Sequence, residues 1–269
     1  MSPKFSIVVP LYNKQEAVGD CISSCINQEF KDFEIIVVND GSTDKSAEIV
    51  EDLFGDKVKL VNQENGGPSA ARNKGVSEAT GEWIVYLDAD DTLLPDALTT
   101  FSKLLSRHPD VKVFCCNFYS ERKGQRSLYS SKYNNGIVSD NFRAWLTKRL
   151  MPRAGATALR KDVALQYRFD EQIRRYEDAK MLFEIFRHER IVTCPIPVLV
   201  NRTDYCAASK LRSNCAEDFV CSVQLGGGEL WEEVAKYFLY VNRKLYGLPI
   251  SRKLGLEIGV FVTKLLSRL

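Results

Sequence analysis

Apolar and polar positions follow two alternating patterns along the first 116 residues of the chain. Short apolar runs predict buried strands, and segments with an apolar residue every three or four positions predict helices. The predicted strands cover residues 5–9, 34–38, 58–61, 83–87 and 111–116, and the predicted helices cover residues 18–26, 44–54, 68–78 and 94–105. Strands and helices in this alternation predict an α/β fold with a mostly parallel sheet that is covered by helices on both faces.

The pattern changes after residue 116. Residues 119–136 are polar and rich in turn-forming residues, which predicts a hairpin or a long surface loop. We then expect helices over 142–151 and 178–187, strands over 191–194 and 196–200 separated by Pro195, a glycine hinge at 226–228, and helices over 229–246 and 250–269. The chain is therefore predicted to have a first half (1–116), a smaller α+β half of the same domain (117–212) and a C-terminal helical extension (213–269).

Charge and composition narrow the class of protein. The 37 Lys and Arg residues nearly balance the 35 Asp and Glu residues, so bulk nucleic-acid binding is not expected. The N-terminus lacks the pattern of a secretion signal, and no window approaches the roughly 18 uncharged apolar residues of a membrane span. The eight cysteines include no C-x-x-C pair. We interpret them as reduced core thiols of a cytoplasmic protein, with a zinc site or a disulfide framework as the alternative.

Polar clusters follow four of the predicted strands, at residues 10–13, 39–44, 62–73 and 88–91. In an open α/β sheet the ligand crevice lies beyond the carboxyl ends of the strands. Any one of these clusters is explained by a surface turn. Four of them at neighbouring strand ends predict a binding site.

The cluster after the fourth strand has three carboxylates within four residues. Asp88, Asp90 and Asp91 would repel one another unless a cation lay among them, and Mg²⁺ or Mn²⁺ commonly bridges such carboxylates to substrate phosphates. The alternative is an acidic cluster that the dipole of the helix beginning near Pro95 stabilises.

The cluster at residues 65–73 combines a glycine-rich turn, a helix start at Pro68 and the guanidinium of Arg72. Backbone N–H groups at a helix N-terminus and an arginine suit a phosphate-bearing ligand, although a plain turn with a solvated Arg72 has the same pattern. The chain has no G-x-G-x-x-G and no P-loop motif, so neither a dinucleotide oxidoreductase nor a P-loop NTPase is supported.

Four motifs, PLYN at 10–13, VNDGSTD at 38–44, NGGPSAARN at 65–73 and DADD at 88–91, together resemble those of the family 2 glycosyltransferases. The resemblance covers residues 4–210. It implies the Rossmann-like GT-A fold and an inverting transfer of one sugar from a nucleotide-diphosphate sugar to an acceptor hydroxyl. It further implies a UDP-sugar as favoured donor, a Mg²⁺ or Mn²⁺ cofactor, and a glycan or lipid-linked acceptor in cell-envelope or capsular polysaccharide synthesis.

The resemblance also assigns roles to single residues. Asp40 would hydrogen-bond the nucleobase, Arg72 would approach the base or the diphosphate, and Asp91 would orient the acceptor or the sugar. The implied nucleotide-sugar set is Pro10, Tyr12, Asn13, Asp40, Gly67, Arg72, Asp88 and Arg202, the implied metal set is Asp88 and Asp90, and the implied catalytic set is Asp91, Glu177 and Asp178.

The Glu177-Asp178 pair matches a Glu-Asp pair that family members carry at a helix start in the second half. An inverting displacement needs a carboxylate opposite the leaving group to take the proton of the attacking hydroxyl. We predict Asp178 as this base. The alternative is that both carboxylates only cap the following helix.

Some features depart from the family pattern or limit its meaning. Asn201 stands where family members often have an aromatic residue, before Arg202 in a predicted phosphate-binding stretch, and no Q-x-x-R-W run supports a processive synthase. His108 and His188 are not expected to be catalytic. Other function classes are an inactive nucleotide-sugar-binding module and a sugar-phosphate nucleotidyltransferase, whose glycine-rich loop after the first strand is missing here.

The apolar stripe of the last predicted helix has three explanations. It packs on the second half, pairs with another subunit in a homodimer, or lies peripherally on the inner face of a membrane.

Overall fold

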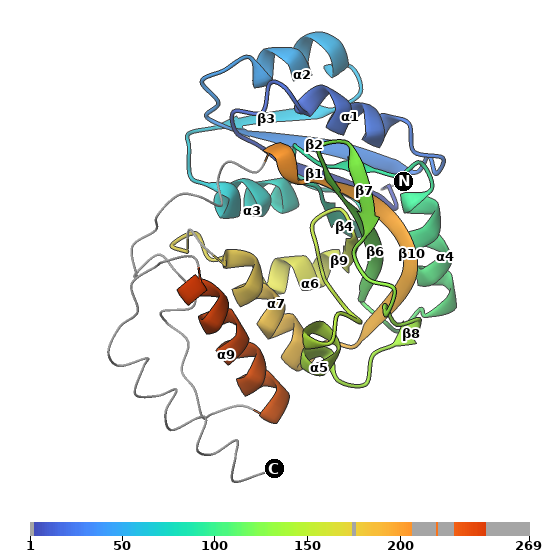
Figure 1. Ribbon diagram of the computed structural model, residues 1–269. Helices are drawn as coiled ribbons and strands as arrows, with labels where there is room; N and C mark the ends of the chain where they lie inside the picture. The colour runs from blue at the N-terminus through green and yellow to red at the C-terminus, as the bar shows by residue number, and fades with distance from the viewer. Residues whose placement is uncertain (1–2, 174–175, 206–218, 220–228, 246–269) are drawn as a thin grey trace.

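The computed structural model describes residues 3–173, 176–205, 219 and 229–245, and shows helices packed on both faces of one twisted sheet (Figure 1). The strands are β1 Phe5–Leu11, β2 Phe33–Asp40, β3 Lys59–Gln63, β4 Trp83–Tyr86, β5 Thr92–Leu93, β6 Val113–Arg122, β7 Gln125–Leu128, β8 Gly136–Ile137, β9 Thr157–Arg160 and β10 Ile191–Arg202. The helices are α1 Val18–Ile26, α2 Ser46–Phe54, α3 Pro68–Glu78, α4 Ala97–Arg107, α5 Asn141–Leu146, α6 Lys161–Gln166, α7 Glu177–His188 and α9 Leu230–Leu245, with a 3-10 turn η1 at Thr203–Tyr205.

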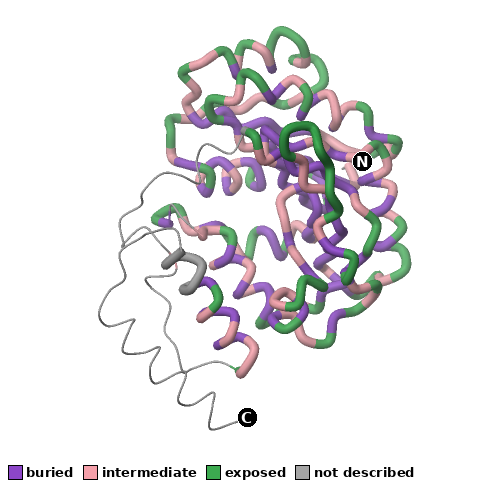
Figure 2. Tube along the Cα trace, in the orientation of Figure 1, coloured by how far each residue is buried: buried purple, intermediate pink, exposed green. Residues whose placement is uncertain are grey.

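The first four strands form the predicted parallel core of the sheet. β1 lies between β2 and β4, and β3 extends the sheet beyond β2, all in parallel pairing. Side chains of β1 point alternately to the two faces of the sheet. Phe5, Ile7 and Val9 pack with α1, α2 and α4 on one face, and Val8 packs with α3 on the other. The buried segments therefore run through the sheet between two helical layers (Figure 2). This confirms the predicted α/β architecture.

Beyond β4 the sheet becomes mixed. The order is β3-β2-β1-β4-β9-β6-β10-β5, and β9 is antiparallel to both of its neighbours, β4 and β6. No strand was predicted over Thr157–Arg160, because only Ala158 and Leu159 of its four residues are apolar and they form no apolar run. The predicted division between residues 116 and 117 falls within β6, so the two predicted halves contribute to the same sheet.

The sequence pattern predicted that strands end at prolines, but two strands of the structure continue through them. Residues 191–202 form one strand, β10, rather than two strands separated by Pro195; its register against β6 shifts on both sides of Pro197, so the missing N–H groups fall where the ladder is irregular. β1 likewise continues through Pro10 to Leu11. Its pairing with β4 stops at Val8, so Pro10 has no ladder bond to lose on that side.

Several helix boundaries also differ from prediction, and α4 begins at Ala97 rather than at residue 94. α2 begins at Ser46 and not at residue 44, and the N–H of Ser46 donates to the side chain of Asp44 at 2.9 Å. α5 ends at Leu146, five residues before the predicted end, where the chain turns with Lys148 in a left-handed conformation. The predicted hairpin after residue 119 is confirmed: β6 and β7 are joined by Lys123 and Gly124, both at positive φ, as a two-residue type I′ turn requires.

The C-terminal prediction is tested only in part. α9 closely matches the helix predicted over 229–246 and packs on α5, with the rings of Trp145 and Phe238 5.9 Å apart. The glycine hinge at 226–228 and the helix over 250–269 lie outside the described residues. Five of the eight cysteines are described, and all five are buried and free. Among the described helices, none has the length and apolar character that would let it span a membrane.

Candidate active site

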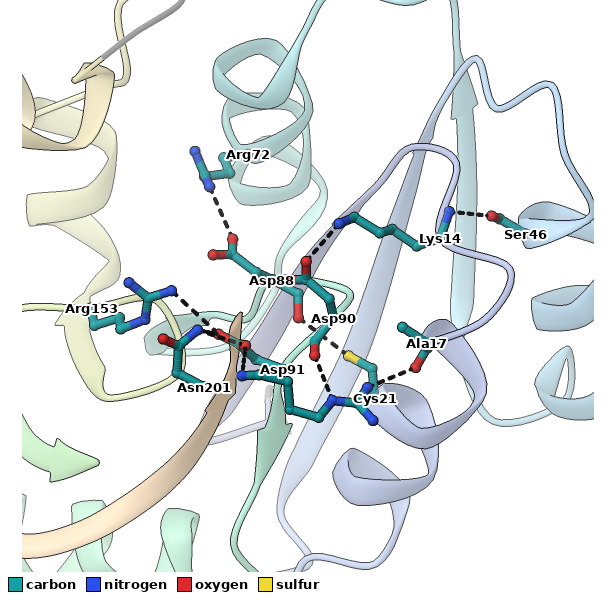
Figure 3. A network of polar contacts seen from close by, with 11 residues as sticks. Lys14, Ala17, Cys21, Ser46, Arg72, Asp88, Asp90, Asp91, Arg153 and Asn201 are labelled. Atoms are coloured by element: carbon teal, nitrogen blue, oxygen red, sulfur yellow. Dashed lines mark hydrogen bonds and ion pairs between the residues drawn. The ribbon is translucent and has the colours of Figure 1, made fainter. Parts of the chain in front are cut away.

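The four polar motifs meet at the carboxyl ends of β1, β2, β3 and β4, as predicted from the strand order. Asn13, after β1, has φ of 50°, and its Oδ1 accepts the N–H of Thr43 at 2.8 Å. The next backbone N–H, of Lys14, donates to Ser46 Oγ at 2.7 Å (Figure 3). These bonds hold the loop after β1 against the start of α2, while the side chain of Tyr12 stays exposed.

Asp40, the last residue of β2, organises the loop between β3 and α3. Its buried carboxylate accepts the N–H of Gly66 at 2.8 Å on Oδ1 and the N–H of Gly67 at 2.8 Å on Oδ2. Gln63 adds a side-chain bond of 2.7 Å. Gly67 has φ of 89°, which glycine adopts readily, and Pro68 follows in the first turn of α3. The predicted contact of Asp40 with a nucleobase stays a prediction; its observed role is to fix this turn.

Arg72 of α3 connects parts of the chain that are far apart in sequence. Its Nη2 lies 3.0 Å from Asp88 Oδ1, its Nη1 lies 3.3 Å from Glu177 Oε1, and its guanidinium lies 5.0 Å from the ring centroid of Phe169. Burial opposes its charge, but Asp88 and Glu177 outweigh burial and raise the pKa of Arg72. Arg72 therefore brings the acidic motif after β4 and the start of α7 to one place.

Each of the three carboxylates after β4 has its own partner in the protein (Figure 3). Asp88 pairs with Arg72, and Asp90 Oδ2 lies 2.6 Å from Lys14 Nζ. Asp91 accepts hydrogen bonds from Asn201 Nδ2 at 2.9 Å and from the backbone N–H of Arg202 at 2.8 Å. The repulsion predicted for this cluster is thus relieved by basic and amide groups of the chain itself.

The environments of these carboxylates differ. The side chain of Asp91 is 1% exposed, against 29% for Asp88 and 11% for Asp90. Burial, and then the charge of Asp88, raise the pKa of Asp91 to about 7. For Asp88, burial opposes ionisation, but Arg72 and Arg153 hold its pKa below the ordinary value. Asp88 is partly exposed, Asp90 is largely buried beside Lys14, and Asp91 points into the protein.

Asp88 and Asp90, the first two carboxylates of the motif, suit the predicted cation in chemical type. Within the described part of the chain, no three His, Cys, Asp or Glu side chains gather closely enough to bind a metal ion by themselves. Mg²⁺ and Mn²⁺ do not need such a cage when a substrate supplies phosphate oxygens, because one or two carboxylates then suffice. Asp88 and Asp90 provide such a pair.

The two carboxylates at the start of α7 also differ. Glu177 is mostly buried against Arg72, and burial together with the charge of Asp178 raises the pKa of Glu177. Asp178 is exposed, and its Oδ1 accepts the N–H of Ala179 at 2.8 Å. Tyr176, with φ of 57°, turns the chain into the helix. Asp178 is therefore accessible to an acceptor, while Glu177 is held by an ion pair.

Arg202 lies behind the acidic motif. Its Nε donates to the backbone carbonyl of Asp90 at 2.7 Å, its Nη1 lies 2.8 Å from Asp20 Oδ2, and its Nη2 donates to the carbonyl of Ala17 at 3.2 Å. These contacts tie β10 to α1 and to the end of β4. Its predicted contact with a phosphate stays a prediction.

Four residues of the site were not predicted: Lys14, Asn73, Arg153 and Asn201. Lys14 directly follows the PLYN motif and Asn73 is the last residue of the NGGPSAARN motif. Their positions in or beside motifs could therefore have indicated that both belong to the site. Asn73 Nδ2 donates to the carbonyl of Phe169 at 2.9 Å, which places that ring beside Arg72. Arg153, 3.8 Å from Asp91, had no signal because it lies in an irregular segment.

The mixed sheet, with helices on both faces, has the GT-A fold that it shares with solved glycosyltransferase structures. Residues 6–168 match the model of Glycosyl transferase family 2, and the chain belongs to this family.

Relatives by sequence carry glycosyltransferase names. Glycosyltransferase GlyA of Streptococcus pneumoniae is 33% identical over 51% of this chain and 21% of its own length. The uncharacterized glycosyltransferase YibD of Escherichia coli is 39% identical over 42% of this chain and 33% of its own length. The uncharacterized glycosyltransferase RP339 of Rickettsia prowazekii is 31% identical over 69% of this chain and 59% of its own length. In each case the match spans less than two thirds of the relative.

Solved structures share the fold at low sequence identity. TarS 1–349 of S. aureus, in complex with UDP-GlcNAc, superposes with a TM-score of 0.70 at 20% identity over 87% of this chain and 69% of that chain. The mannosyltransferase PcManGT of Pyrobaculum calidifontis, in complex with GDP-Man and Mn²⁺, gives a TM-score of 0.61 at 17% identity over 99% of this chain and 81% of that chain.

Proposed function

We propose that this protein is a metal-dependent inverting glycosyltransferase that moves one sugar from a nucleotide-diphosphate sugar to a hydroxyl of a glycan or lipid-linked acceptor. One observation carries the proposal: Arg72 contacts Asp88 after β4 and Glu177 at the start of α7, so the acidic motif and the carboxylate pair that includes Asp178 lie around one guanidinium. Family membership and the nucleotide-sugar complexes of the structural neighbours support it.

The donor end of the site is formed by the loops after β1 to β4. Asp88 and Asp90 would hold Mg²⁺ or Mn²⁺, which supplies positive charge to a diphosphate as it leaves. Arg72 provides a fixed cation beside Asp88 and approaches the base or the diphosphate. Pro10 at the end of β1, with Tyr12 and Asn13 in the loop that follows, flanks the nucleobase, and Asp40 hydrogen-bonds it.

The acceptor end is formed by α7. As the acceptor oxygen bonds to the anomeric carbon, the bond from that carbon to the diphosphate oxygen breaks, and the hydroxyl proton passes to Asp178. Attack opposite the leaving group inverts the anomeric configuration. Asp178 suits this role because its carboxylate is exposed, whereas Glu177 holds Arg72.

Asp91 and Arg202 are assigned positioning roles. Both are buried and bonded to backbone groups or amides around the end of β4. Asp91, through Asn201 and Arg202, fixes β10 against β4, and Arg202 supports the carbonyl of Asp90. Their contribution to sugar or phosphate binding is thus indirect.

The partners and the cellular site are proposed from the family resemblance and from the structural neighbours. A UDP-sugar is the favoured donor, because TarS is solved with UDP-GlcNAc. The acceptor belongs to envelope or capsular glycan synthesis, and we propose that the protein works in the cytoplasm or peripherally at the inner face of the membrane.

The first test measures release of nucleoside diphosphate from a panel of UDP- and GDP-sugars with Mn²⁺ or Mg²⁺. We expect release from one class of donor, loss of release in EDTA, and a fall of at least about two orders of magnitude in Asp90→Asn, the scale of losing a main electrostatic stabiliser. Asp56→Asn, an exposed turn residue, is the matched control and should keep normal rates. Full release in EDTA would contradict the metal assignment, and binding without release would indicate an inactive binding module.

A further inference from the structure

The ion pair between Lys14 and Asp90 lies at the centre of the proposed metal site (Figure 3). Lys14 Nζ is 2.6 Å from Asp90 Oδ2, and the two side chains are only 24% and 11% exposed. The ammonium thus neutralises Asp90, the more buried of the two carboxylates that are proposed to hold the cation.

The backbone of Lys14 is held in place, but its side chain is flexible. Its backbone N–H donates to Ser46 Oγ, and its carbonyl accepts the N–H groups of Ala17 and Val18 at 2.9 Å. A lysine carries its charge on a flexible four-carbon stem, so the ammonium can move while the backbone stays in place. Arg72, in contrast, contacts two carboxylates and an aromatic ring at once.

A divalent cation at Asp90 would meet this ammonium at close range. Like charges a few ångströms apart repel, so the cation must displace Lys14 or bind against its charge. A diphosphate changes this balance, because it brings enough negative charge for both the cation and the ammonium.

We propose that Lys14 is an internal counter-ion that competes with the divalent cation for Asp90 and makes tight metal binding depend on the diphosphate of the donor. Asp90 is neutralised by Lys14 in the absence of donor and by the metal in its presence. Lys14 is then released toward the diphosphate and helps to bind it. This inference rests on the proposed metal site.

The test is titration of Mn²⁺ into the full-length protein by calorimetry, without nucleotide and then with UDP or GDP at saturation. Without nucleotide, Lys14→Met should bind Mn²⁺ about fivefold more tightly than wild type, the scale of one ion pair that no longer has to be broken. With the diphosphate, the advantage should disappear or reverse, so the diphosphate should strengthen Mn²⁺ binding less in the variant than in wild type.

Two variants control for charge and structure. Lys14→Arg keeps a cation and should resemble wild type. Lys4→Met removes an equivalent ammonium, 2.6 Å from Glu82 in the turn that precedes β4, and should leave Mn²⁺ binding unchanged. Unaltered melting temperatures confirm that each variant is folded.

The outcomes separate this inference from the proposed function. If Lys14→Met binds Mn²⁺ as wild type does under both conditions, or more weakly without nucleotide, Lys14 does not compete and the inference is overturned. If Asp90→Asn abolishes Mn²⁺ binding in the same series, the metal site itself stands. If Asp90→Asn binds Mn²⁺ normally, or no variant binds it under either condition, the metal assignment fails and the inference fails with it.

Discussion

At the scale of single residues, Asp91 and Asn201 form a buried polar contact that supports the site without being open to it. The amide of Asn201 lies 2.9 Å and 3.1 Å from the two oxygens of Asp91. A carboxylate in this position needs donors, because burial and Asp88 oppose its charge. Asn201, a departure from the family pattern, is thereby explained as the partner of Asp91.

We expect Asn201→Leu to lower the free energy of unfolding by about 2 kcal/mol, since a buried carboxylate loses one of its donors. The loss should grow between pH 5 and pH 8. The pKa of Asp91 in the folded protein, about 7, is above its ordinary value of 3.8. Protonated Asp91 therefore contributes stability that is fully present below pH 3.8 and is lost as the pH rises through 7. Without Asn201 the charged form is still less favourable. Urea unfolding at both pH values measures this; an equal effect at both would contradict the assignment.

The extent to which the site could be predicted depends on residue type and position. The carboxylates after β4, Arg72 and the Glu177-Asp178 pair were predicted because they lie in motifs at strand or helix ends. Lys14 was not, because a lysine in a loop has the same pattern whether it is solvated or paired. Which carboxylate each base contacts depends on tertiary packing, which spacing along the chain does not contain.

At the scale of elements, the parallel strands were predicted well and the second part of the sheet less well. β1 to β4 are short buried strands followed by helices, and this pattern is strong in sequence. β9 lies between β4 and β6 in the sheet, although it begins at Thr157, more than forty residues after β6 begins at Val113. Its place is therefore set by long-range pairing. The prolines of β10 are tolerated because the ladder is irregular there.

Glu34 shows how the opposite end of the sheet is held. One oxygen, Oε1, accepts the N–H groups of Thr80 at 2.6 Å and Gly81 at 3.0 Å, and the hydroxyl of Ser6. The turn lies so close to β1 that a Cβ atom on Gly81 would be 2.5 Å from Ser6 Oγ. Glu34 therefore fastens the turn before β4 to β1 and β2.

We expect Glu34→Gln to lower the free energy of unfolding by about 1–2 kcal/mol at pH 7. Burial opposes ionisation, but the bonds from Ser6 and Thr80 hold the pKa of Glu34 below its ordinary value of 4.5. Its stabilisation is present above 4.5 and is lost as pH falls through the lower folded pKa. The difference between variant and wild type should thus shrink toward pH 3 in thermal unfolding. Glu82→Gln, at a half-exposed neighbour, is the control; an equal effect of both variants would contradict the role of Glu34.

At the scale of the whole molecule, the site is assembled from distant parts of one sheet and its flanking helices. Arg72 and Glu177 are 105 positions apart, and Asn73 bonds to Phe169 across 96 positions. Both contacts start from one turn of α3. The donor motifs and the candidate base are therefore held together by α3, and the relative position of the two ends of the site is a property of the folded sheet.

In the proposed mechanism, Asp178 takes the acceptor proton at a site whose donor end is built by the first four strands. This step is tested most directly by comparing Asp178→Asn and Glu177→Gln, with donor affinity measured by calorimetry and turnover by release of nucleoside diphosphate from the donor that the panel identifies. Asp178→Asn should lower turnover by about 10²–10⁴ with an unchanged donor Kd, and Glu177→Gln should cost less. Near-normal turnover in Asp178→Asn with none in Glu177→Gln would make Glu177 the base, and normal turnover in both would leave the pair as a helix cap and contradict the mechanism.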